Sequence, residues 1–487
     1  MVSRRSVLAG LLAGVASPAL AEGLLVSPRP PVRDGVVATA AGSADALIAA
    51  AGLGGDVGFC LADARTGEML EAVHATDPLP PASTAKVITS LYALERLGTA
   101  HRFVTRVVAL GPVSGGVVQG DLVLAGSGDP ELDTDDLGDL AAALAQAGVR
   151  GVTGRFLVAG GALPWIEEIA ADQPEHVGYN PAISGLNLNY NRVNFEWKRD
   201  GGGYAVQMDA RGERFVPLVR MARMKVVDRE GPLFTYKARG GAEDWTVSRG
   251  ALGKGGSRWL PVRNPALYAG EVFQTLCAAQ GLRLPEPVEA GTVTGGMVLA
   301  QVVGDPLPDV LRRMLRWSTN LTAEVMGLSA SGAGGLADSG GAMSDWARMR
   351  FGMQARFVDH SGLGAASRVA PVEMVRALVA AQGTPMGGPL KTVLRDLGMK
   401  GEDGAKIDSS VRVIGKTGTL NFVSGLVGYI QPPKGREMAF AIYCADTTRR
   451  DALSRDEREQ PAGGKTWLKK ARRLQGQLVN RWAGLYV

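Results

Sequence analysis

The stretch from Pro80 to Leu97 constrains the fold of this chain more than any other. Two prolines fix its entry, and no residue that disfavours a helix follows them until Gly98. Apolar side chains recur at helical spacing within it, at Val87, Ile88, Leu91, Leu94 and Leu97. The pattern predicts a helix with one buried face that begins close to Ser83.

Ser83 and Lys86 bring a hydroxyl and an amine to the first turn of this predicted helix. Residues three apart share a face, and the N-terminal end of a helix is electropositive. Such a pair can form a nucleophile and its base. The alternative is an ordinary polar first turn, with a capping serine and a solvated lysine, and the tetrad alone favours that alternative.

Two further short motifs occur once each. Ser83-Thr84-Ala85-Lys86 is the one S-x-x-K sequence, and Ser318-Thr319-Asn320 is the one S-x-N sequence, within a helical pattern from Val310 to Met326. Lys416-Thr417-Gly418 is the one K-T-G sequence, beside strand-like runs at 411–414 and 423–430. Three single-copy motifs in this order are stronger evidence than any one of them.

The residue types suit acyl transfer by a serine. When Ser83 attacks a carbonyl, a base must take its proton, and the chain has only four histidines and no G-x-S-x-G motif. Lys86 can be that base if burial or a nearby positive charge lowers its pKa. Lys416 is the candidate for that charge, so we expect it close to Lys86.

The other motif residues have matching roles. Ser318 can relay a proton to the leaving group, and Asn320 can hold Lys86 or a substrate carbonyl. The substrate-binding candidates are Thr417, Gly418 and Thr419, where two hydroxyls beside Lys416 suit a carboxylate. The backbone N–H groups of Ser83 and Thr419 are candidate oxyanion donors.

These motifs are typical of penicillin-binding proteins and class A β-lactamases. Longer stretches extend the likeness, at residues 126–130, 184–191, 320–324, 359–363 and 415–420. The chain resembles the D-alanyl-D-alanine carboxypeptidase/endopeptidase family of class C penicillin-binding proteins, peptidase family S13. The resemblance implies a serine D-Ala-D-Ala carboxypeptidase that acts on peptidoglycan stem peptides through an acyl-enzyme on Ser83, with endopeptidase activity as a second expectation. It also implies covalent binding of β-lactams and no metal or organic cofactor.

By the same resemblance the fold is α/β, with an antiparallel sheet flanked by helices in a split catalytic domain. That domain would comprise residues 36–105 and 290–487. An inserted domain would cover residues 106–195 and 262–289, with a nested domain at residues 196–261, and the insertions would be mainly β. The separation of 235 positions from Ser83 to Ser318 fits this arrangement better than a compact β-lactamase.

The chain departs from the family pattern in two places. Family members carry an aspartate soon after the strand equivalent to residues 155–158, associated with the free amine of a diaminopimelate side chain. Here the sequence continues Ala159-Gly160, so that contact is absent. His360 stands where the family has glycine, and we expect it to be a packing residue, with Asp359 and Ser361 bracing the loop.

The two ends of the sequence indicate where in the cell the protein is located. Residues 1–21 carry paired arginines, an apolar run and Ala19-Leu20-Ala21, which predicts a signal peptide and export to the periplasm by the Sec or twin-arginine route. An apolar stripe near the C-terminus predicts a helix packed on a sheet. Its basic opposite face, Lys469 to Arg473, leaves a peripheral membrane contact as the alternative.

Charge and cysteine content limit the functions that the chain can have. The formal charge is +5, and removal of Arg4 and Arg5 would leave +3, which is too mild to indicate a nucleic-acid partner. The three widely spaced cysteines predict buried free thiols. Two other functions stay open: a β-lactamase or D-amino-acid amidase on the same site, and a non-catalytic cell-wall-binding protein.

Overall fold

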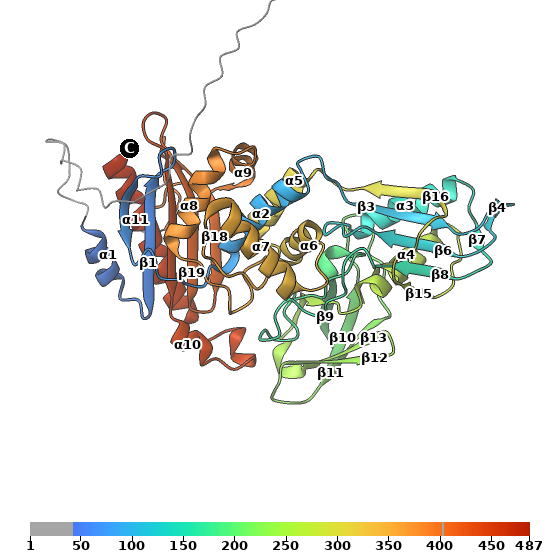
Figure 1. Cartoon of the computed structure of the whole chain (residues 1–487). Helices are drawn as coiled ribbons and strands as arrows, with labels where there is room; N and C mark the ends of the chain where they lie inside the picture. The colour runs from blue at the N-terminus through green and yellow to red at the C-terminus, as the bar shows by residue number, and fades with distance from the viewer. Residues whose placement is uncertain (1–41, 402–403) are drawn as a thin grey trace, which may run out of the picture. The chain divides into compact units, whose positions relative to one another are not determined.

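A computed structural model describes residues 42–401 and 404–487, so the predicted signal peptide at residues 1–21 lies outside the described residues. Its central element is a six-stranded sheet in which every neighbouring pair of strands is antiparallel. The strands come from distant parts of the sequence, so blue β1 lies among red and orange strands in Figure 1. In sheet order they are β17 (Arg395–Asp396), β18 (Arg412–Leu420), β19 (Val423–Gln431), β20 (Met438–Ala445), β1 (Asp56–Asp63) and β2 (Met69–Val73). The predicted α/β class is confirmed.

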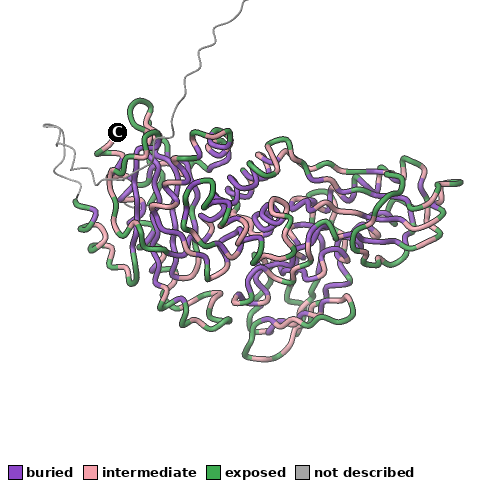
Figure 2. Tube along the Cα trace, viewed as in Figure 1, coloured by how far each residue is buried: buried purple, intermediate pink, exposed green. Residues whose placement is uncertain are grey.

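The two faces of this sheet belong to two hydrophobic cores. Phe59 and Leu61 of β1 enter one core, whereas Cys60 and Ala62 enter the other, as the alternation of a strand requires. The first core is closed by α1 (Ala44–Ala51) and α11 (Gly464–Tyr486). Helices on the second face are α2 (Ala85–Arg96), α5 (Leu307–Trp317), α6 (Asn320–Ser331), α7 (Leu336–Phe351), α8 (Pro371–Gln382) and α9 (Gly387–Val393). The strands β1, β19 and β20 and the helix α2 are buried almost throughout, and Figure 2 shows this part of the molecule mostly in purple.

The C-terminal stripe packs on the sheet as predicted. Trp467, Leu474 and Trp482 are buried, and the Trp482 ring packs against Phe59 with centroids 5.3 Å apart. Lys469 and Arg473 on the opposite face are exposed. None of the helices in the described part of the chain is both long and apolar enough to span a membrane.

A five-stranded sheet lies between the first and second motifs in sequence. Helices α3 (Thr134–Gln146) and α4 (Pro265–Ala279) contribute to its core. Its order is β15 (Pro287–Ala290), β8 (Phe156–Ala159), β6 (Leu122–Gly126), β3 (Val104–Ala109) and β16 (Met297–Val303). The predicted boundary at residue 290 assigned β16 to the catalytic domain, whereas its pairing with β3 puts it in this inserted sheet.

Three smaller sheets complete the described strands. One contains β4 (Val113–Ser114), β5 (Val117–Val118) and β7 (Gly151–Val152). Another contains β10 (Gly203–Asp209), β9 (Arg192–Asp200) and β14 (Gly255–Pro261), and the last contains β11 (Ala222–Val227), β13 (Ala242–Ser248) and β12 (Phe234–Arg239). The predicted boundary at residue 196 falls inside β9.

The predicted continuous helix over 310–326 is wrong. The chain forms α5 and α6 instead, and Ser318 between them has left-handed backbone angles, φ 60° and ψ 37°. Ser, Thr and Asn make local hydrogen bonds that compete with helix, which explains the break within the S-x-N motif. The break places Ser318 at a corner instead of along a helix face.

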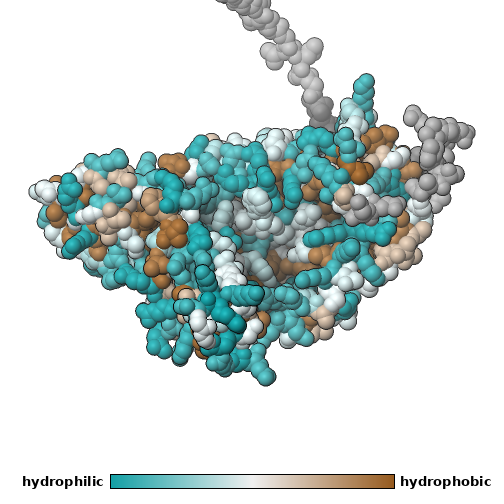
Figure 3. All heavy atoms as spheres, turned by 180° about the vertical axis from the view of Figure 1, so that it is seen from behind, coloured by the Kyte–Doolittle hydropathy of each residue, from teal (hydrophilic) through white to brown (hydrophobic). Residues whose placement is uncertain are grey.

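The face of the protein in Figure 3 is mostly hydrophilic, with hydrophobic residues in small separate groups. Cys60, Cys277 and Cys444 are buried and free, as predicted. Burial raises the pKa of each thiol to about 12, so these cysteines are packing residues and not nucleophiles.

Candidate active site

Ser83 lies in a single turn of 3-10 helix, η1 (Ala82–Thr84), that leads directly into α2. Ala82 has φ 47°, a left-handed value that a residue with a side chain rarely adopts. Lys86 follows one turn later, and its Nζ donates a hydrogen bond to Ser83 Oγ at 3.0 Å. The predicted pairing of hydroxyl and amine is therefore present.

The Lys86 ammonium is fully buried and its hydrogen bonds are all inside the site. Besides Ser83, Nζ donates to Asn320 Oδ1 at 2.8 Å and to the Ser361 carbonyl oxygen at 2.8 Å. Asn320 begins α6, so three separate segments converge on one nitrogen. This geometry directs one N–H of Lys86 at the Ser83 hydroxyl.

Lys416 lies on β18, on the other side of the same site. Its Nζ donates to Ser318 Oγ at 2.9 Å and to the Thr417 carbonyl oxygen at 2.7 Å. Lys416 is only 3% exposed. The structure thus brings together Ser83, Lys86, Ser318, Asn320 and Lys416, although these residues are spread over most of the sequence.

Burial sets the protonation of both lysines. It lowers the pKa of Lys86 to about 8, against the carboxylates of Glu324 and Asp359, which raise it. For Lys416, burial first and then the charges of Lys86 and Arg395 put the pKa well below its usual value. The expected cause was wrong in one respect: burial, and not the charge of Lys416, lowers the pKa of Lys86.

Sequence reasoning missed the part that Glu324 plays. This α6 carboxylate is fully buried and accepts hydrogen bonds from the backbone N–H groups of His360 and Ser361, both at 2.9 Å. It therefore fixes the segment whose Ser361 carbonyl holds Lys86. Burial and the nearby Asp359 raise the pKa of Glu324 to about 8. Its position four residues after Asn320, on the same helix face, was the available signal.

Asp359 braces the loop, as predicted. Its carboxylate accepts from the backbone N–H groups of Gly362 at 2.8 Å and Gly364 at 2.5 Å. His360 is fully buried, and one ring nitrogen lies 2.7 Å from Ser339 Oγ. Burial lowers the pKa of His360 to about 3, so the ring is neutral and packed away from Ser83.

Two glycines let the elements of the site approach closely. A Cβ on Gly418 would lie 2.8 Å from the Pro81 carbonyl oxygen and 3.1 Å from Ser83 N. A Cβ on Gly362, where φ is +75°, would lie 1.9 Å from the Ala82 carbonyl oxygen. The absence of a side chain at Gly418 therefore lets β18 approach η1 closely, and its direct contact with substrate stays a prediction.

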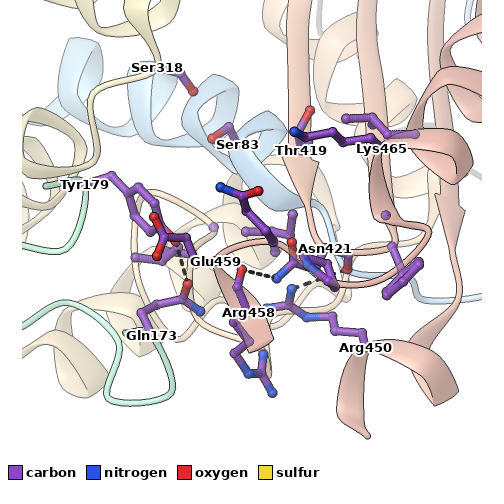
Figure 4. A pocket seen from close by; sticks show the side chains of 18 of the residues that line it. Ser83, Gln173, Tyr179, Ser318, Thr419, Asn421, Arg450, Arg458, Glu459 and Lys465 are labelled. Atoms are coloured by element: carbon purple, nitrogen blue, oxygen red, sulfur yellow. Dashed lines mark hydrogen bonds between the residues drawn. The ribbon is translucent and has the colours of Figure 1, made fainter. Parts of the chain in front are cut away.

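A cleft of about 640 Å³ opens over these groups (Figure 4). Ser83, Ser318, Asn320, Thr417 and Thr419 line its catalytic end. Both threonines are exposed, so their hydroxyls and the Lys416 amino group beside them suit a carboxylate.

The other end of the cleft is rich in cations. Arg450 and Arg458 line it, together with Glu459, whose two oxygens accept hydrogen bonds from His176 and Arg258. A third cation, Lys465, lies beside Thr419 (Figure 4). Hydrogen bonds from His176 and Arg258 hold the pKa of Glu459 down at about 2. The cations that line the cleft therefore outnumber the carboxylates that line it, and this charge does not favour a cationic side chain on the substrate.

Comparison with known sequences identifies the family. Residues 40–466 match the D-Ala-D-Ala carboxypeptidase 3 (S13) family. Over 444 residues the chain is 29% identical to a D-alanyl-D-alanine carboxypeptidase of Actinomadura sp. (strain R39), covering 82% of this chain and 79% of the relative. It is 23% identical over 446 residues to the D-alanyl-D-alanine carboxypeptidase DacB of Haemophilus influenzae, covering 83% and 88%.

Solved structures agree on the fold. The crystal structure of penicillin-binding protein 4 from Haemophilus influenzae superposes with a TM-score of 0.70 at 20% identity, covering 91% of this chain and 99% of that one. A predatory endopeptidase from Bdellovibrio bacteriovorus gives a TM-score of 0.50 at 16% identity, covering 88% and 94%. The chain belongs to the S13 family of D-Ala-D-Ala carboxypeptidases and is a serine peptidase of the class C penicillin-binding proteins.

Proposed function

We propose that the protein removes the terminal D-Ala from peptidoglycan stem peptides through an acyl-enzyme on Ser83. The observation that carries this proposal is the 3.0 Å hydrogen bond between Ser83 Oγ and a buried lysine whose pKa is lowered to about 8. A neutral Lys86 can accept a proton near physiological pH, which an exposed lysine cannot do.

In the first step Ser83 Oγ attacks the carbonyl carbon of the penultimate D-Ala, and its proton passes to Lys86 Nζ. The carbon–nitrogen bond then breaks, and the proton held by Lys86 passes through the Ser318 hydroxyl to the leaving amine, which leaves Lys86 neutral. The carboxylate of the departing D-Ala lies at Thr417 and Thr419, beside Lys416. Water then attacks the ester carbon and gives a proton to Lys86, the bond to Ser83 Oγ breaks, and Lys86 returns the proton to Ser83 Oγ.

The backbone N–H groups of Ser83 and Thr419 are the proposed oxyanion donors. The close approach of β18 to η1 at Gly418 supports this assignment, because the two donors must face one carbonyl oxygen. Cleavage of cross-links by the same steps is a second proposal, supported by the fold shared with an endopeptidase.

β-Lactams would acylate Ser83 in place of the peptide and leave slowly. A related structure of penicillin-binding protein 4 in complex with a β-lactam, with a TM-score of 0.70 at 19% identity, supports this part of the proposal. Location in the periplasm rests on residues 1–21. A membrane contact through α11 would have to use its basic face, because its apolar stripe is buried in the sheet core.

The test is release of D-Ala from a peptide that ends in D-Ala-D-Ala. We expect release by the wild-type protein and a loss of at least about 10⁴-fold in kcat for Ser83→Ala, as for other serine nucleophiles. A matched control is Ser90→Ala on the same helix, whose hydroxyl donates to the Lys86 carbonyl oxygen away from the cleft. Absence of D-Ala release by wild-type protein would refute the proposal.

A further inference from the structure

A second groove, of about 960 Å³, begins where the catalytic cleft ends. Thr417, Lys465 and Leu468 line both cavities, so the two spaces meet at the proposed carboxylate site. The groove runs between β18 and β19 on one side and α11 on the other, and Gly418, Gly425 and Gly476 are among its lining residues. A leaving group larger than D-Ala would extend from Thr417 into this space.

The charged groups of this groove, as far as it is described, are all cations. Its lining contains Arg395, Lys400, Lys465, Lys469, Arg472 and Arg473, and no carboxylate among the described lining residues. Each of the six is exposed. Cations around a concave surface concentrate a positive potential there.

Two contacts couple this potential to the site. Arg472 Nη2 donates a hydrogen bond to Thr419 Oγ1 at 3.2 Å, so a groove residue directly contacts a proposed substrate-binding hydroxyl. Arg395 pairs with Gly415, the residue before Lys416, across β17 and β18, and its charge lowers the pKa of Lys416. A surface patch unrelated to catalysis would have neither interaction.

Resting on the proposed function, we propose that this basic groove is a leaving-group subsite for acidic peptides. The preferred substrate would be a peptide in which D-Ala is the acyl residue and the leaving residue after it carries a second carboxylate, as at an acidic cross-link. The main-chain carboxylate would lie at Thr417 and Thr419, and the additional anion would lie against Arg472, Lys469 and Arg473. The reaction is the same hydrolysis, and the groove would bind one additional negative charge of the leaving residue.

The test compares two synthetic peptides that differ only in leaving-group charge, one ending in D-Ala-D-Glu and the other in D-Ala-D-Gln. We expect the wild-type protein to prefer the D-Glu peptide by about three- to tenfold in kcat/KM, because exposed charge pairs contribute modestly. The preference should shrink as salt is added. In Lys469→Gln/Arg473→Gln the ratio should fall to about one.

The matched control is Lys470→Gln. This neighbouring cation on the same helix points at the Gly52 carbonyl oxygen, at 3.3 Å, and does not line the groove, so its ratio should equal that of the wild type. A wild-type ratio near one, or an equal fall in the control, overturns the inference. If no peptide, including one ending in D-Ala-D-Ala, is cleaved, the proposed function itself has failed.

A third measurement separates a peptide site from a lipid surface. Wild type and the double variant are sedimented with vesicles of phosphatidylglycerol and phosphatidylcholine. If the double variant loses vesicle binding while the D-Glu to D-Gln ratio stays unchanged, the groove is a membrane-facing surface, and the leaving-group assignment is wrong. Loss of the ratio without a change in sedimentation supports the assignment.

Discussion

Lys86 combines two properties that oppose each other. Its complete burial favours the neutral amine that a base requires, whereas Glu324 and Asp359 favour the charged form. The result is a pKa of about 8, close to the pH at which a general base works best. The two carboxylates also accept hydrogen bonds from the backbone N–H groups of Ser361 and Gly362. They therefore stabilise the loop beside Lys86 as well as raising its pKa.

The first prediction concerns the pH dependence of catalysis. Because Lys86 must lose its proton to act as base, kcat/KM should rise about tenfold per pH unit below pH 8 and level off above it. The measurement is kcat/KM for a D-Ala-D-Ala peptide between pH 5.5 and 10. A profile that is flat from about pH 6 to 9 would contradict the role of Lys86.

The Glu324→Gln variant supplies a second readout for the same prediction. The Glu324 carboxylate raises the pKa of Lys86, so its removal should move the midpoint of the profile to lower pH. A purely structural role for Glu324 would lower activity at every pH and leave the midpoint in place.

Residue types in the three motifs were sufficient to predict which side chains meet. The S-x-x-K spacing fixed the Ser83–Lys86 pair, because residues three apart on a helix are neighbours. The hydrogen bond from Lys86 to the Ser361 carbonyl oxygen could not be predicted, since it depends on tertiary packing between α2 and the loop after α7.

At the scale of elements, the site is a junction of one strand, one helix start and one helix break. Strand β18 packs against η1, and α6 begins where the Ser318 backbone turns. The sequence predicted a strand near the K-T-G motif and a helix near Ser83. It could not predict the break at Ser318, because the apolar residues of α5 and α6 keep a common period across it.

Gly418→Ala should separate β18 from η1. The new Cβ would lie 2.8 Å from the Pro81 carbonyl oxygen, so the strand must shift by some tenths of an ångström. We expect about a 10- to 100-fold loss of kcat/KM and a loss of about 1–3 kcal/mol in the free energy of unfolding. Urea denaturation and D-Ala release are the measurements.

Gly203→Ala in β10 is the matched control, because its Cβ would meet nothing closer than 3.8 Å. It should leave both quantities nearly unchanged. Wild-type kinetics in Gly418→Ala would show that the close approach of β18 is not required.

A second element-scale prediction concerns α6 and the loop it packs on. A Cβ on Gly327 would lie 2.0 Å from the His360 ring, so Gly327→Ala should destabilise the protein by about 1–3 kcal/mol. In a His360→Gly background the same change should cost far less, since the ring is gone. Chemical denaturation of the four proteins in this double-mutant cycle measures the coupling. Additive losses would mean that the two residues do not compete for space.

At the scale of the whole described chain, the insertion forms part of the cleft. Tyr179 lines the cleft, and its carbonyl oxygen accepts a hydrogen bond from Asn320 Nδ2 at 3.0 Å. The segment after β20 reaches the same region through Glu459, which binds His176 and Arg258, each at 2.7 Å. The sequence could not show that β16 pairs with β3, because a short apolar run does not reveal which sheet it joins.

Glu459→Gln should loosen this contact. The two charge-assisted hydrogen bonds contribute about 1–3 kcal/mol each to local stability, and the neutral amide keeps the shape without the charge. We expect faster amide hydrogen exchange in residues 456–459 and around Arg258, with a higher KM for peptide. Glu457→Gln, in the same turn but bonded only to Ser454, is the control and should leave exchange around Arg258 unchanged. If amide hydrogen exchange around Arg258 is equal in Glu459→Gln and Glu457→Gln, the Glu459 contact does not hold the segment after β20 to the insertion.

The central claim is that Ser83 is the acylated nucleophile, and intact-protein mass spectrometry with a β-lactam tests it most directly. Wild-type protein should gain the mass of one penicillin, persist as the adduct and carry it on the peptide that contains Ser83. Ser83→Ala should gain none. No adduct on the wild type, an adduct on another residue, or rapid turnover of penicillin without an adduct would contradict the account, and rapid turnover would favour a β-lactamase.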